Sequence, residues 1–186
     1  MPAGIECADA IIKGAPVDSI STGTTHPGKY VVLVTGDTAS VEIAGDIVTE
    51  RTRPSLIDSV FLADAAVAVA EALLGHERPV TLDAEAVGVV ETSTISAGID
   101  AADAAVKHAN VSLSGLRLAD GLGGKAYFIV DGTVGEVDAA VEAANDRSGD
   151  GVTDCVVIAQ LTPELRVDLE AATRFADRVA TYGDWT

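Results

Sequence analysis

The sequence has few of the residues that would indicate a redox site, a disulfide framework or a membrane span. Only two of its 186 residues are cysteines, Cys7 and Cys155, and they form no CxxC motif or Cys/His cluster at ligand spacing. This usage is typical of a reducing compartment. No segment approaches the roughly 18 apolar residues of a membrane span, and the N-terminal segment lacks the basic and apolar stretches of a signal peptide. We therefore expect a cytoplasmic protein with no membrane partner.

Basic and aromatic residues are also scarce. Lys and Arg total 12 against 29 Asp and Glu, which gives a formal net charge of −17. Nucleic acids are bound mainly through Lys and Arg contacts to phosphate, so this charge argues against nucleic-acid binding. Aromatic residues make up 4% of the chain although 48% of it is hydrophobic. A core of Ala, Val, Ile and Leu favours thin helix-on-sheet layers over large aromatic pockets.

The sequence contains no recognisable catalytic motif. Its three histidines, His26, His76 and His108, have no Ser or Cys nucleophile at motif spacing. No HExxH, P-loop or GxGxxG motif following a strand is present. The sequence therefore predicts a protein that is not an enzyme.

An internal repeat is the strongest signal in the chain. Residues 3–15, AGIECADAIIKGA, match residues 97–109, AGIDAADAAVKHA, at an offset of 94. Further along the offset becomes 96, where Gly28-Lys29 aligns with Gly124-Lys125, Gly36 with Gly132, and Val41 with Val137. One short insertion between two matched blocks is what a duplicated domain with divergent loops produces. We place the first domain at 1–80 and the second at 81–186.

Each copy has the hydrophobic patterns of an α/β module. In the second copy we expect strands at 86–92, 111–116, 126–130 and 152–159, and helices at 97–109, 133–145 and 163–180, with Thr94 and Ser96 as N-cap candidates. In the first copy the corresponding elements are a helix at 3–15, a strand at 30–34, a helix at 38–50, a strand at 56–62 and a helix at 63–74. No counterpart of the 86–92 strand precedes the first helix. Residues 76–84, which include Pro79, form the linker.

These residues resemble the bacterial microcompartment shell domain. The resemblance rests on a strand ending in Glu91-Thr92, a helix with Ala-Ala-Asp-Ala and a lysine four residues after the Asp, a glycine-rich loop, and a strand-Asp-Gly-helix junction. It covers 86–172 and most of 3–75. It implies two tandem shell domains, each an antiparallel sheet flanked by helices. The tandem class to which it points forms trimers that mimic a hexamer, tile a shell facet with other shell proteins, and pass small polar metabolites through a central pore.

The resemblance also assigns two loops to the pore. In the second copy this loop is Gly121, Leu122, Gly123 and Gly124, and in the first copy it includes Thr24, Thr25, His26 and Pro27. From the residues alone, the glycine loop is equally well explained as a tight turn with positive φ. Backbone N–H groups without side chains suit anions, and threonine hydroxyls can both donate to and accept from a polar solute.

His26 lies where tandem relatives from propanediol-utilisation compartments carry a cysteine that holds an iron–sulfur cluster. Such clusters are normally bound by thiolates, and neither Cys7 nor Cys155 lies in this loop. We therefore predict no cofactor, and interpret His26 as a polar gate. A metal ion bound by the His26 side chains of three copies is the alternative, because three imidazoles are a common ligand set.

Lys13 and Lys107 each follow an aspartate by four residues, Asp9 and Asp103. As a sequence pattern this is an i, i+4 surface pair worth a few tenths of a kcal/mol. The resemblance instead implies that both lysines lie at the tile edge and contact the next tile. Two other functions remain open at this point: a redox or metal conduit at His26, and a trimeric ferredoxin-like protein that binds a regulatory ligand.

Overall fold

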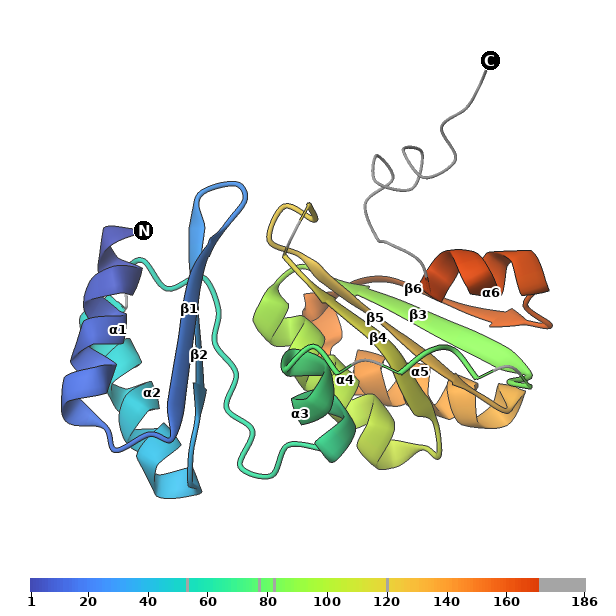
Figure 1. Cartoon of the computed structure of the whole chain (residues 1–186), viewed down its shortest axis with the longest axis horizontal. Helices are drawn as coiled ribbons and strands as arrows, with labels where there is room; N and C mark the ends of the chain where they lie inside the picture. The colour runs from blue at the N-terminus through green and yellow to red at the C-terminus, as the bar shows by residue number, and fades with distance from the viewer. Residues whose placement is uncertain (53, 77, 82, 120, 171–186) are drawn as a thin grey trace, which may run out of the picture.

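The computed structural model describes residues 1–52, 54–76, 78–81, 83–119 and 121–170, and shows two α/β units along the chain (Figure 1). The first unit contains α1 (Pro2–Gly14), β1 (Ser19–Thr25), β2 (Lys29–Thr35) and α2 (Thr38–Thr52). A connecting segment and the short helix α3 (Val67–Leu73) follow. The second unit contains β3 (Ala86–Thr92), α4 (Ile95–His108), β4 (Ser112–Leu118), β5 (Ala126–Gly132), α5 (Val134–Ser148), β6 (Val152–Ala159) and α6 (Pro163–Glu170), with a short 3-10 turn at Gly149–Gly151.

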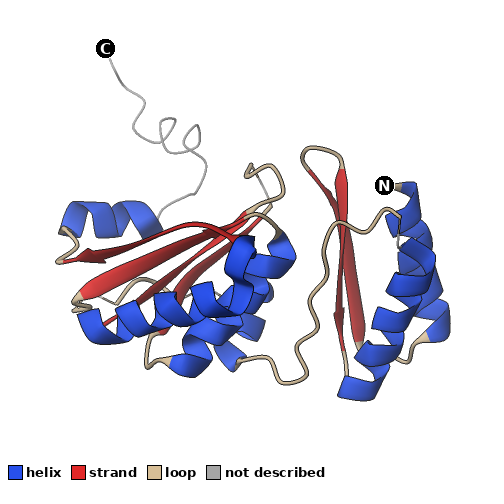
Figure 2. Ribbon diagram, turned by 180° about the vertical axis from the view of Figure 1, so that it is seen from behind, coloured by secondary structure: helices blue, strands red, loops and turns tan. Residues whose placement is uncertain are grey.

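The second unit is a four-stranded antiparallel sheet covered by helices. Its strand order is β4-β5-β3-β6, so β3 pairs with β5 on one side and with β6 on the other. Helices α4 and α5 pack over one face of the sheet (Figure 2). The core on that face includes Val90, Phe128, Val130 and Val137, all fully buried. This unit has the architecture expected for a shell domain.

The first unit repeats half of that arrangement. β1 pairs with β2 in an antiparallel hairpin, and α1 and α2 pack on it around Cys7, Ile11, Ala15 and Ala44. β1 was not predicted: we expected Thr24 and Thr25 to belong to the pore loop, but both belong to this strand. Most of Ser19–Thr25 is exposed, which suits its polar residues, and the strand pairs along its whole length with the apolar β2.

The strand predicted at 56–62 is wrong, since these residues form no helix or strand. The second unit gives the physical reason. There the corresponding strand, β6, is bonded to β3 and to no other strand of the sheet. In the part of the chain that the structure describes, no strand occupies the place of β3 beside β2. Residues 56–62 therefore stay extended without a ladder, and Ile57 is 63% exposed.

The predicted helices are confirmed within the described residues, with shifts in their ends. α1 begins with Pro2 at its first turn, where the missing N–H is not needed, and ends before Pro16. Thr94 caps α4 by accepting from Ala97 N at 3.0 Å, whereas Ser96 lies inside that helix. Of the helix predicted at 63–74, only Val67–Leu73 is helical. Of the helix predicted at 163–180, Pro163–Glu170 is helical and 171–180 lies outside the described residues.

Asp37 caps α2, and the stability that this cap contributes depends on pH. Its carboxylate accepts from the backbone N–H of Ser40 at 2.9 Å and from the Ser40 hydroxyl at 2.8 Å. These hydrogen bonds hold the pKa of Asp37 below its usual value, because they stabilise the charged form. The cap therefore contributes stability above the unfolded-state pKa of Asp37 and loses it as the pH falls through the folded-state pKa.

Gly98 allows α4 to approach the sheet closely. A Cβ at this position would lie 2.6 Å from Ala126 Cβ and 2.9 Å from Thr92 Oγ1. We expect Gly98→Ala to lower the free energy of unfolding by about 1–3 kcal/mol through overpacking. The control is Gly135→Ala on α5, where an added Cβ meets nothing within 4 Å; stability there should be unchanged or raised by up to about 1 kcal/mol. Urea denaturation measures both, and equal effects would contradict this account of α4 packing.

Candidate functional site

The two predicted pore loops connect equivalent strands and lie next to each other. The first runs from Thr25 to Gly28 between β1 and β2, and the second occupies the connection between β4 and β5. They project from the same end of their sheets (Figure 1). Lys29 Nζ lies 3.5 Å from the carbonyl oxygen of Gly123 and donates a hydrogen bond to it. The chain itself therefore brings the two loops together.

The first loop is a tight turn that exposes His26. Gly28 N donates to the carbonyl of Thr25 at 3.0 Å, and Gly28 has a φ of 86°. The His26–Pro27 peptide bond is cis. His26 and Pro27 are exposed, whereas Thr25 is buried and its hydroxyl has no hydrogen-bond partner. Of the predicted residues here, Thr24 lies within β1, Thr25 is its last residue, and His26 and Pro27 form the turn.

The second loop depends on glycine. Gly121, Gly123 and Gly124 have φ values of 75°, 66° and 82°, in the region that side chains rarely adopt. The turn is closed by Leu122 N donating to the carbonyl of Ala119 at 3.0 Å. This supports the tight-turn interpretation, and leaves the pore-lining interpretation a prediction. Gly121 and Gly123 are exposed, so their backbone groups can contact solutes.

Lys29 is a functional candidate that the sequence analysis missed. A Cβ on Gly124 would lie 2.5 Å from Lys29 Nζ and 2.8 Å from its Cδ, so the lysine side chain lies directly over Gly124. The repeat aligns Lys29 with Lys125, and the two have different partners. Lys125 Nζ lies 2.6 Å from Glu91 Oε1, and this contact holds the pKa of Glu91 below its usual value. Among the described residues, the hydrogen-bond partner of Lys29 is the neutral carbonyl of Gly123, so Lys29 differs from Lys125 in lacking a carboxylate partner there.

A metal at His26 would need more than one chain. Among the described residues, no group of three or more His, Cys, Asp or Glu side chains could hold a metal ion. Cys7 is buried in the core of the first unit, and burial raises the pKa of its thiol, which disfavours the thiolate. Cys155 lies on β6 and accepts a hydrogen bond from Asn145. Neither cysteine belongs to either loop, so among the described residues of the two loops the His26 imidazole is the sole His or Cys side chain.

The two predicted edge lysines have different surroundings. Lys13 Nζ lies 2.6 Å from Asp9 Oδ2, and their side chains are 72% and 60% exposed. Lys107 Nζ also lies 2.6 Å from Asp103 Oδ2, but the Asp103 side chain is only 7% exposed. The sequence suggested the same surface pair in both places. The first matches that description, and the second does not.

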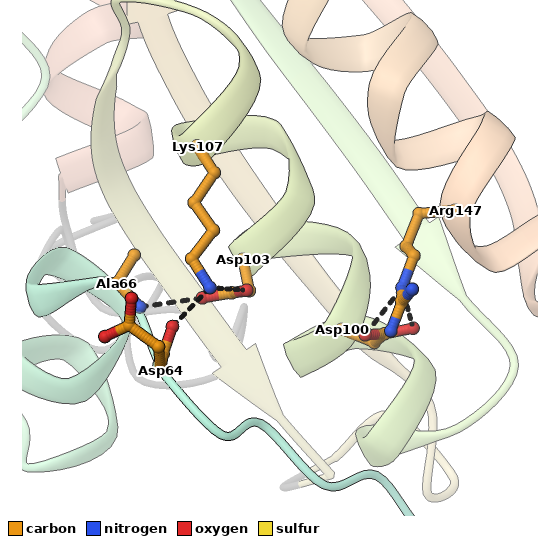
Figure 3. A network of polar contacts seen from close by, with 6 residues as sticks. All are labelled: Asp64, Ala66, Asp100, Asp103, Lys107 and Arg147. Carbon is orange, nitrogen blue, oxygen red and sulfur yellow. Dashed lines mark hydrogen bonds and ion pairs between the residues drawn. The ribbon is translucent and has the colours of Figure 1, made fainter.

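Asp103 is buried because the connecting segment lies on it. The backbone N–H of Ala66 donates to Asp103 Oδ1 at 2.7 Å, and Lys107 Nζ donates to the carbonyl of Asp64 (Figure 3). On the far side of α4, Asp100 accepts from Arg147 Nε of α5 at 3.0 Å (Figure 3). Helix α4 is thus fixed to α5 on one side and to residues 64–66 on the other.

Comparison with known proteins places these features in a family. The family model of the BMC domain, the bacterial microcompartment domain, matches residues 1–65 and again residues 86–161. The chain belongs to the BMC-domain family. It is 37% identical over 148 residues to the bacterial microcompartment shell protein PduT of Citrobacter freundii, with 79% of each chain covered. It is a structural shell protein of a bacterial microcompartment.

Solved structures agree with this assignment. A microcompartment protein from Desulfitobacterium hafniense DCB matches with a TM-score of 0.77 and 33% identity, covering 90% of this chain and 93% of that one. The fused permuted hexameric shell protein MSM0275 from the RMM microcompartment matches with a TM-score of 0.54 at 22% identity, and supports the fold alone. Among the described residues of this shell protein, no helix has the length and apolar character needed to cross a membrane.

The difference between the two lysines leads to a stability prediction. Lys107→Ala removes the cation beside a buried carboxylate, and we expect it to cost about 1–2 kcal/mol. This is less than the 3–5 kcal/mol of a fully buried pair, because Lys107 is 44% exposed. Lys13→Ala breaks an exposed pair with the same spacing and should cost under about 0.5 kcal/mol. Chemical denaturation of the two variants at matched concentration checks this, and an equal loss would show that Asp103 does not depend on Lys107.

Proposed function

We propose that three copies of this shell protein assemble around a three-fold axis into a pseudohexameric tile with a central pore. The observation that carries the proposal is the Lys29–Gly123 contact, which places the loop of one unit beside the loop of the other. Three chains supply six units and six loops. A ring of six units brings these loops together at its centre in alternating order.

The pore would be lined by two kinds of surface. The first loop contributes His26 and Pro27, with Thr24 and Thr25 at its base, and the second contributes the backbone of Gly121–Gly124. Exposed N–H groups and Lys29 favour anionic or polar solutes. The chain carries a formal net charge of −17. Three Lys29 ammonium groups near the axis would therefore form a positive region in a protein that is negatively charged as a whole. We infer a passage for small polar metabolites.

The edge of the tile would carry Lys13 and Lys107. Lys107 is held by Asp103 and the carbonyl of Asp64, yet 44% of its side chain remains exposed. A lysine that is held and exposed can contact a neighbouring tile with less loss of side-chain entropy than a free one. Other shell proteins and further copies of this tile are the partners that this edge would meet.

The proposed role is structural and not enzymatic. The histidines of the chain lack a nucleophile at motif spacing, and the relative PduT is named a shell protein.

Assembly tests the proposal directly. We expect a mass of three times 18.9 kDa by light scattering, and flat two-dimensional sheets by electron microscopy at higher concentration. Flat sheets require the proposed edge contacts. A monomer at all concentrations would overturn the three-copy tile, and a discrete trimer that never forms sheets would overturn the edge contacts.

Metal analysis tests the role of His26. The polar gate predicts that trimers incubated with Zn²⁺, or anaerobically with iron, retain no more metal than His26→Ala trimers. Three imidazoles on one axis predict one ion per three chains, lost in His26→Ala. We expect the first result. The Thr24→Ala variant is a matched control, because it changes the same hairpin without removing an imidazole.

A further inference from the structure

A buried hydroxyl at the end of β1 has no hydrogen-bond partner among the described residues. It belongs to Thr25, which is 7% exposed and is the last residue of that strand. Most buried polar side-chain atoms in folded proteins have a partner, because leaving one unpaired costs free energy. A threonine hydroxyl can both donate and accept. The Thr25 hydroxyl is therefore able to contact a bound group.

Lys29 lies directly opposite Thr25 in the hairpin. The two residues form the last pair in the register of β1 with β2. Side chains of directly opposed residues lie on the same face of a sheet, with their Cβ atoms about 5 Å apart. From this face the Lys29 side chain reaches the second unit, where its Nζ lies 3.5 Å from the carbonyl oxygen of Gly123. The hydroxyl and the ammonium group therefore share the face of the hairpin that is turned to the glycine loop.

The charge of Lys29 is not matched by a carboxylate in the part of the chain that the structure describes. Its partner is a neutral carbonyl at 3.5 Å, which is longer than the usual N–H···O distance of about 2.7–3.2 Å. Lys125, with which the repeat aligns it, instead lies 2.6 Å from Glu91 Oε1. An ammonium group has three N–H donors. Lys29 can therefore donate to a further acceptor, and its charge favours an anionic one.

The glycine loop brings backbone, and no side chain, to this ammonium group. Gly124 is buried, and a Cβ there would lie 2.5 Å from Lys29 Nζ and 3.0 Å from its Cε. Gly123 is exposed and has a φ of 66°, a conformation that side chains rarely adopt. A small solute can therefore approach Lys29 along the exposed side of the loop.

We propose that Thr25 and Lys29, with the backbone of Gly123 and Gly124, form a binding site for one small oxyanion, a carboxylate or a phosphate group. Lys29 Nζ supplies the positive charge, and Thr25 Oγ1 donates a hydrogen bond to an oxygen of the anion. Both side chains come from one hairpin, and the backbone beside them comes from the second unit. Each chain therefore holds a complete site.

A fixed anion site has a consequence for the pore, and that consequence rests on the proposed tile. Three copies of the site would lie where neighbouring loops meet around the axis. A bound monoanion would cancel the charge of each Lys29, so the lining would change from positive to neutral as the sites fill. His26 lies on the exposed turn and takes no part in holding the anion.

Titration of the full chain with acetate and with inorganic phosphate tests the proposal. At constant ionic strength, set with sodium chloride, we expect saturable shifts of the Gly123 and Gly124 amide signals in an NMR spectrum, with one anion per chain. Saturation by only one of the two anions supports the site and identifies its ligand as a carboxylate or a phosphate. Shifts that do not saturate with either anion, or equal shifts with neutral glycerol, would overturn the site.

The charge requirement is tested with two lysine variants. Lys29→Met removes the ammonium group and keeps the length of the side chain, and it should weaken anion binding about tenfold or more. Lys13→Met is the matched control, because it makes the same change in net charge at an exposed ion pair on α1. Its dissociation constant for the anion should be that of the unaltered chain. Equal weakening in the two variants would show that net charge alone attracts the anion.

Thr25→Val separates a binding role of the hydroxyl from a structural one. Valine keeps the shape of the side chain, so anion binding should weaken about tenfold. The melting temperature without anion should be unchanged or raised, because no partner is lost. A lowered melting temperature with unchanged binding would assign the hydroxyl to folding and overturn its place in the site. Thr22→Val is the control, because Thr22 lies on the opposite face of the same strand and should leave binding unchanged.

The outcomes for the site and for the tile can be told apart. Trimers and sheets that bind neither acetate nor phosphate would reject the site and leave the tile intact. Saturable anion binding by a chain that never forms trimers would support the site and reject the tile.

Discussion

The Asp103 carboxylate is the point at which the segment that follows the first unit is fixed to the second unit. A carboxylate that is 7% exposed must be matched by donors, because an unpaired buried charge is costly. One donor, Lys107, comes from the same helix four residues later, and the other is the backbone N–H of Ala66 in the connecting segment. The second unit is therefore complete only with residues that follow the first unit. Val69 of α3 is fully buried in the same core, which extends this dependence from hydrogen bonding to packing.

The two copies differ because a sheet strand needs a partner on its edge. In the second unit β3 is bonded on both sides, and β6 joins the sheet through β3 alone. Residues 56–62 have a pattern similar to β6 but no strand beside them among the described residues. Leu56, Ile57 and Phe61 then remain exposed, whereas Val60 and Leu62 pack against the core of the second unit. Local β-propensity was sufficient to suggest a strand there and insufficient to form one.

The sequence predicted the helices well because their signals are local. Apolar spacing marked α1, α2, α4 and α5, and Thr94 was found as a cap from its residue type. It predicted β1 and Asp103 poorly because their environments are set by distant residues. Ser19–Thr25 is polar and was partly taken for a loop, yet its register with β2 makes it a strand. Asp9 and Asp103 share one motif, and only the segment lying on α4 distinguishes an exposed ion pair from a buried one.

The candidate loops were assigned from the family resemblance. Lys29 was not singled out, because a lysine at the start of a strand usually indicates a solvated side chain. The available signal was the glycine at 124, where a Cβ would leave no room for the Lys29 chain. In the proposed ring of six units, tandem duplication has a consequence for the loops. Six identical chains would present six identical loops to the axis. Two fused and diverged copies would present two loop types in alternation, so His26 and Lys29 would occur three times each, with the glycine loops between them. Substitutions in one loop type can then alter the charge and width of the proposed passage. The sheet and helices that carry the other loop type stay unchanged.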